Sequence, residues 1–128
     1  MKFKDILYTK KELESIGYSI ENNIIEGADV SVIGHFGNAV SLNIYCSNCC
    51  IYHDRNDTQH LGHLMKWIVE LLDLTDEDGY HFFSKMKNIP IRIVCDGEGW
   101  GSKVVGFGNF IKDKFIIVDD LTAIDEFE

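Results

Sequence analysis

The chain has 128 residues, a formal net charge of −9 and 45% hydrophobic residues. This size predicts a single domain, residues 1–128, with a buried core, and the composition is unlike that of disordered chains. The negative charge argues against direct binding to nucleic acid or to an anionic membrane, because phosphate contacts require clustered lysine and arginine. The sequence shows no signal-peptide pattern and no apolar run that could span a bilayer, so we expect a cytoplasmic protein with reduced cysteines.

The first half of the chain predicts a short helix, a hairpin and a principal helix. Thr9 can cap a helix over residues 10–16 that ends at Gly17, within an N-terminal extension of residues 1–23. Alternating apolar residues predict strands over residues 28–33 and 39–45, joined by a turn at residues 35–38. Apolar residues at helical spacing between Leu61 and Leu72 predict the principal helix, which is amphipathic.

The second half predicts three further strands, over residues 89–94, 103–111 and 115–118. A glycine-rich turn at residues 96–101 and a turn at residues 112–114 separate them, and residues 122–128 form an acidic tail. Gly106 and Gly108 fall inside a strand, which indicates bulges or close approaches of the backbone. The pattern predicts an α+β fold: a mainly antiparallel sheet of about five strands with one principal amphipathic helix on a face.

Cysteine and histidine residues in the middle of the chain suggest a metal site. Zinc takes four thiolate or imidazole ligands, and the candidates are Cys46, Cys49, His60 and His63. Their spacing differs from that of a classical zinc finger, because ten residues separate the inner ligands and two separate the histidines. The alternative is that the cysteines are reduced, partly buried and behave as small hydrophobes. A small zinc-stabilised structural or adaptor module is therefore one hypothesis.

A second candidate is the glycine-rich turn between two predicted strands. Backbone N–H groups there could approach an anion, and the tryptophan could stack on a base. Basic residues on the neighbouring strands could face phosphates. The ligand-binding candidates are Gly99, Trp100, Gly101, Ser102, Lys103, Arg92 and Lys112. The turn matches neither a Walker loop nor a dinucleotide fingerprint, and a plain hairpin turn is the alternative.

A third candidate is an acidic group that follows the principal helix. It comprises Asp73, Asp76, Glu77 and Asp78, and it could imitate nucleic acid on a basic partner or be an ordinary solvated surface. No local pattern pairs a nucleophile with a base. We therefore expect no catalytic residues, no enzymatic activity and no cofactor, with zinc as the alternative.

The run from Gly108 to Phe115, together with the strand entry Lys87-Asn88-Ile89-Pro90, resembles a family of small phage and prophage proteins of Firmicutes. The resemblance implies a phage setting, in which small proteins often counter host defence. On that basis the expected partner is a host defence protein, bound by acidic mimicry, or a small signalling nucleotide that the protein sequesters. Because a short open sheet has edges to cover, we also expect that the chain can form a homo-oligomer.

Overall fold

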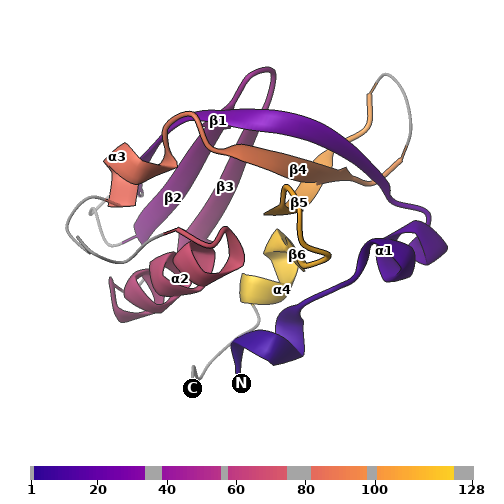
Figure 1. The fold of residues 1–128 in the computed structure, drawn as a ribbon. Helices are drawn as coiled ribbons and strands as arrows, with labels where there is room; N and C mark the ends of the chain where they lie inside the picture. The colour runs from indigo at the N-terminus through magenta and orange to yellow at the C-terminus, as the bar shows by residue number, and fades with distance from the viewer. Residues whose placement is uncertain (1, 34–38, 56–57, 75–81, 98–100, 123–128) are drawn as a thin grey trace.

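The computed structural model describes residues 2–33, 39–55, 58–74, 82–97 and 101–122 (Figure 1). Six strands form one antiparallel sheet in the order β3-β2-β1-β4-β5-β6. The strands are β1 (Ser19–Ile33), β2 (Ala39–Cys46), β3 (Cys50–Arg55), β4 (Pro90–Cys95), β5 (Val104–Asn109) and β6 (Phe115–Ile117). The helices are η1 (Phe3–Ile6), α1 (Lys10–Ile16), α2 (Thr58–Leu71), α3 (Phe82–Met86) and α4 (Val118–Thr122).

Strand β1 belongs to both halves of the sheet. Its first half, residues 19–24, pairs with β4, and its second half, residues 25–33, pairs with β2. An irregularity between Ile25 and Gly27 separates the two halves. The sheet therefore consists of two meanders, β1-β2-β3 and β1-β4-β5-β6, that share a single strand.

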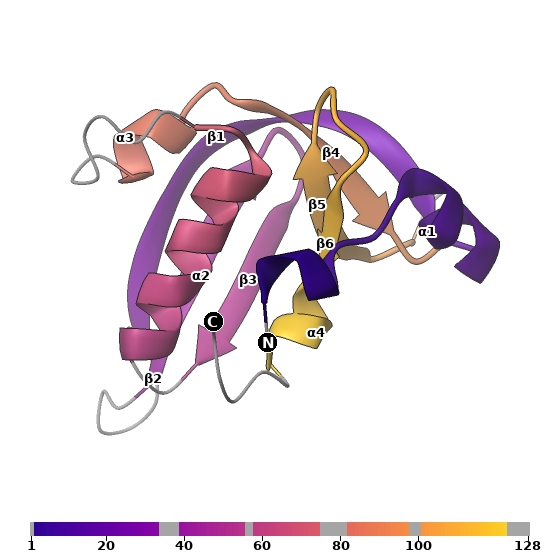
Figure 2. The same ribbon diagram turned by 60° about the horizontal axis from the view of Figure 1, so that its bottom comes forward.

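Helices cover both faces of this sheet, but over different strands. Figure 2 shows α2 along the concave side of the curved β1-β2-β3 meander, with η1 and α4 beside it. Apolar side chains from these elements and from β4 and β5 form the main core, which includes Leu42, Ile44, Leu64, Ile68 and Phe107. Helix α1 covers the opposite face over the other meander, and it forms a smaller core of Leu13, Val94, Phe115 and Ile117.

The predicted α+β class is confirmed, with six strands where about five were expected. Helix α1 begins and ends as predicted: the Thr9 hydroxyl accepts from the Glu12 N–H at 3.2 Å, and Gly17 adopts a left-handed conformation. The additional strand is β3, and β1 begins nine residues before the predicted start, at Ser19. Residues 19–23 are therefore part of the sheet, and the predicted turn at residues 35–38 lies outside the described residues.

The prediction for the two strand glycines is also confirmed. A β-carbon on Gly106 would lie 2.1 Å from the carbonyl oxygen of Ile116, and one on Gly108 would lie 2.3 Å from the Phe115 ring. Both distances are far below van der Waals contact. These glycines therefore let β6 pack closely on β5.

Candidate functional site

The four predicted zinc ligands are not brought together. Cys46 and Cys49 flank the turn between β2 and β3, whereas His60 lies in the first turns of α2, against the far end of β3. Within the described part of the chain, no group of three or more histidine, cysteine, aspartate or glutamate side chains is arranged to hold a metal ion. The zinc hypothesis therefore remains a prediction without geometric support.

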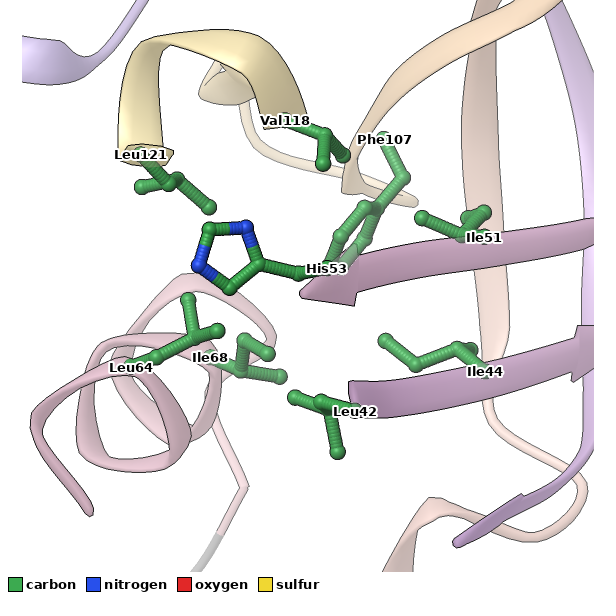
Figure 3. Close-up of a pocket in the computed structure, with 9 residues that line it drawn as sticks. All are labelled: Leu42, Ile44, Ile51, His53, Leu64, Ile68, Phe107, Val118 and Leu121. Carbon is green, nitrogen blue, oxygen red and sulfur yellow. The ribbon is translucent and has the colours of Figure 1, made fainter. Parts of the chain in front are cut away.

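His60 instead meets His53, a residue of β3 that the sequence analysis did not select. Both are buried, and Figure 3 shows the His53 ring among apolar side chains of β2, α2 and α4. The Nε2 atoms are 3.2 Å apart and the ring centroids 5.3 Å apart, so the rings meet tip to tip. Zinc takes four ligands, and among the described residues no third histidine, cysteine, aspartate or glutamate joins this pair in an arrangement that could hold a metal ion. The pair as placed is a hydrogen bond between β3 and α2.

The space beside His53 is small. The cavity there has a volume of about 10 Å³ and is lined mostly by aliphatic side chains. That volume is roughly what a single water molecule requires, and a nucleotide needs several hundred cubic ångströms. This cavity is therefore a packing defect of the main core and cannot hold a ligand of nucleotide size.

The predicted nucleotide-binding residues divide between the two ends of β5. Gly101, Ser102 and Lys103 precede the strand, and the Lys103 N–H donates to the Asp96 carboxylate at 2.7 Å. Arg92 and Lys112 lie at the other end, which is about 20 Å away for a strand of this length. Gly99 and Trp100 lie outside the described residues. Lys103 therefore cannot share a single phosphate group with Arg92 or Lys112.

The predicted acidic surface is described only at Asp73. Its carboxylate lies 3.0 Å from the ammonium groups of both Lys112 and Lys114. Hydrogen bonds from Lys112 and then Lys114 lower the pKa of Asp73. The negative charge of Asp73 is thus balanced by two lysines of the same chain. Asp76, Glu77 and Asp78 lie outside the described residues.

Many side-chain hydrogen bonds surround the connection from β5 to β6, residues 109–114, here called the β5–β6 loop. Asn109, the last residue of β5, is buried and uses both ends of its side-chain amide. Its Oδ1 accepts from the backbone N–H groups of Ile111 and Lys112, at 2.9 and 2.8 Å. Its Nδ2 donates to the Leu71 carbonyl and to Asp73, both at 2.9 Å. One amide thus folds the loop and fixes it to the end of α2.

Three further side chains, those of Arg92, Lys114 and Asp113, fix the same loop to its neighbours. The Arg92 guanidinium of β4 donates to the carbonyls of Asn109 and Lys112, at 2.9 and 2.8 Å, and stacks 4.6 Å from the Phe115 ring centroid. The Lys114 ammonium donates to the Glu70 carbonyl of α2 at 2.8 Å. The Asp113 carboxylate accepts from the first N–H of α1 at 2.6 Å. Arg92 and Lys112, predicted as phosphate ligands, therefore act here as supports of the loop.

The loop exposes two large apolar side chains. Ile111 is 86% exposed, the highest value among the exposed large hydrophobic side chains of the described residues, and Phe110 is 41% exposed. An isoleucine side chain in water contributes nothing to the core. Hydrogen bonds from the Asn109 and Arg92 side chains nevertheless hold the loop backbone that carries Ile111. Binding residues are typically found on loops that a rigid scaffold positions. The sequence pattern does not indicate this exposure, because it predicts that Phe110 and Ile111 continue the strand.

A second group of polar side chains lies on the outer face of β1-β2-β3, where Asn43 is buried and Tyr45 is partly exposed. Its side chains bond mainly to one another: the Asn43 amide donates to Asp29 and Ser31, and the Tyr45 hydroxyl donates to Asp29 at 3.0 Å. The hydrogen bond to Asp29 raises the pKa of Tyr45. Because these groups satisfy each other within the sheet, their presence is explained by the fold, unlike that of Ile111.

Comparisons of the chain with protein-family models, with curated proteins and with solved structures find no match. None of the described helices is both long enough and apolar enough to cross a membrane. The functional argument therefore depends on the geometry of the β5–β6 loop.

Proposed function

We propose that the chain is a non-enzymatic binding protein that attaches to a partner protein through the β5–β6 loop. The observation that carries the proposal is Ile111, which is 86% exposed at the tip of a loop held by α1, α2 and β4. An apolar side chain on an ordered loop can enter a pocket of a partner without a large loss of conformational entropy. Phe110, beside it, adds the aromatic area that binding hot spots favour.

The charge of the chain supports a particular kind of partner. At −9 the protein is attracted to basic surfaces, and such attraction raises association rates. The partner we propose therefore has an apolar pocket within a basic surface, as a protein that binds nucleic acid would have. Following the resemblance to phage proteins, we propose that the binding counters a host defence protein.

The alternative of nucleotide sequestration has less support. Arg92 is occupied by backbone carbonyls and Lys112 by Asp73, while Lys103 lies at the opposite end of β5. For a zinc-stabilised module, the two thiols Cys46 and Cys49 lie together, but His60 lies elsewhere, bonded to His53. Neither arrangement offers a formed site for its ligand.

Substitution of Ile111 tests the proposal. Wild type, Ile111→Ser and Val32→Ser are immobilised and exposed to extract of a Firmicutes cell, and bound proteins are quantified by mass spectrometry. Val32 is the matched control, since it is an aliphatic residue, 66% exposed, on β1. A specific partner should be retained by wild type and by Val32→Ser, and its purified form should bind Ile111→Ser about 10- to 100-fold more weakly, the range of a hot-spot residue.

Two results would contradict this proposal. Equal affinity of the purified partner for Ile111→Ser and wild type would remove the loop from the interface. Sedimentation that shows a wild-type dimer and an Ile111→Ser monomer would assign the loop to self-association. Circular dichroism and thermal melting of each variant establish that it is folded, because an exposed side chain is expected to alter stability little.

A further inference from the structure

The turn between β2 and β3, residues 46–49, here called the cysteine turn, places two thiols opposite each other. Ser47 and Asn48 are its two central residues, and the Cys46 N–H donates to the Cys49 carbonyl at 2.8 Å. The neighbouring pair in the ladder is Tyr45 with Cys50. Cys46 and Cys49 therefore continue the register as a directly opposed pair whose side chains share one face of the hairpin.

The spacing of such a pair suits a disulfide. In a hydrogen-bonded antiparallel pair the Cα atoms are about 5.5 Å apart, and disulfides span about 4.4–6.8 Å between Cα atoms. Cys49 is close enough to Cys46 to add, after burial, to the raised pKa of Cys46. Formation of the bond therefore requires little movement of the backbone.

The two thiols differ in access. Cys46 is 6% exposed and packs in the main core, whereas Cys49 is half-buried. The Asn23 amide reaches Cys49 Sγ at 3.9 Å and also lines an open surface depression of about 370 Å³ with Asn48 and Ser47. Because Cys49 is half-buried and Cys46 almost fully buried, a reagent from solvent reaches Cys49 more readily than Cys46.

We propose that Cys46 and Cys49 form a reversible disulfide by exchange with a low-molecular-weight disulfide such as oxidised glutathione. The Cys49 thiolate attacks one sulfur of the reagent, forms a mixed disulfide and releases one glutathione thiolate, which takes up a proton. Cys46 then loses its proton and attacks Cys49 Sγ, which forms the protein disulfide and releases the second glutathione. Two protein thiols are oxidised, and one molecule of oxidised glutathione is reduced to two thiols.

The surroundings determine the rate and the specificity of this exchange. Burial raises the pKa of Cys49, and burial first among several causes raises the pKa of Cys46 to about 12. Few molecules carry Cys49 as thiolate at neutral pH, so exchange is slow there. The rate should rise about tenfold per pH unit as long as the pH is below the pKa of Cys49. Cys50 lies on the other face of the hairpin and Cys95 lies outside it, in β4, so Cys46 is the cysteine directly opposite Cys49.

The test is incubation of the folded, reduced protein with defined ratios of oxidised and reduced glutathione at pH 7 and pH 8. The expected product has lost about 2 Da, the mass of two hydrogens, and a peptide map links Cys46 to Cys49. Cys50→Ser and Cys95→Ser should react as the wild type does. Cys46→Ser should stop at the mixed disulfide with one glutathione, and Cys49→Ser should give no product.

Three outcomes would overturn the proposal. One is a linkage that uses Cys50 or Cys95, and another is reaction only after denaturant has unfolded the chain. The third is a native mass that contains one zinc, with thiols that exchange only after a chelator is added, because this would return the cysteine turn to metal binding. Retention of the native circular dichroism spectrum in Cys46→Ser and Cys49→Ser ensures that a lost product reflects the missing sulfur.

Discussion

The β5–β6 loop and the cysteine turn are organised by the same device, an asparagine whose side chain makes four hydrogen bonds. Asn109 bonds to two backbone N–H groups, a carbonyl and a carboxylate. Asn23 bonds to the N–H groups of Ile24 and Ser47, to Asn48 and to Cys49. The number of bonds is equal, but Asn109 is 6% exposed and Asn23 is half-buried. Burial, more than bond count, should therefore determine how much each turn depends on its asparagine.

The largest expected effect concerns the close approach that supports the β5–β6 loop. Gly106→Ala places a β-carbon 2.1 Å from the Ile116 carbonyl oxygen, so β6 has to move and the free energy of unfolding should fall by about 3 kcal/mol or more. Gly27→Ala is the control in the other meander, because a β-carbon there has no neighbour within 4 Å. Urea unfolding of both variants measures the difference, and equal stability would mean that β5 and β6 are not packed as described.

The asparagine comparison is tested directly by two alanine variants. Asn109→Ala leaves the buried Leu71 carbonyl and two part-buried loop N–H groups without their partner, and we expect a loss of about 2–4 kcal/mol. Asn23→Ala exposes its partners to water, which can replace the lost bonds, and should cost about 1 kcal/mol. Denaturant titrations at one pH give both values. A larger loss for Asn23→Ala would reverse the argument from burial.

The smallest expected effect is the pH dependence that Asp73 contributes to the loop. Its pKa is lower in the folded protein than the ordinary value of 3.8, so the folded state binds fewer protons and the contribution exists above that value. It is lost as the pH falls through the lowered pKa. Because the ion pairs are exposed, the loss should be at most about 1 kcal/mol. Unfolding free energies measured between pH 7 and pH 2 should fall less in Asp73→Asn than in the wild type.

The sequence predicts most of the sheet, because most of its strands show alternating apolar and polar residues or carry glycine where two backbones approach closely. It misses β3, where Cys50 and Tyr52 place a thiol and a hydroxyl on the outward positions and suggest a loop or a metal site. It also misses the first half of β1, since Glu21, Asn22 and Asn23 form a polar run without apolar alternation. Pairing with β4, about 70 residues later in the chain, makes these residues a strand although their local sequence pattern does not predict one.

The candidate site was predictable only in part. The run from Gly108 to Phe115 was selected, and its turn was located at residues 112–114. The sequence pattern does not indicate where β5 ends. Asn109 stops the strand because its side chain takes the N–H groups of Ile111 and Lys112, which a continuing strand would offer to a neighbour. These two hydrogen bonds leave Phe110 and Ile111 exposed. The position of the Asn109 amide in turn depends on its bonds to Leu71 and Asp73, which are distant in the sequence.

The sharing of β1 between the two meanders has a consequence for how the molecule opens. Neither meander can detach as a unit without taking along a strand to which the other is hydrogen-bonded. Partial opening that spares one half is therefore costly, and amide protons on both sides of Ile25 should exchange with solvent through the same global event. The protein is expected to lose its two halves together, in a single cooperative transition.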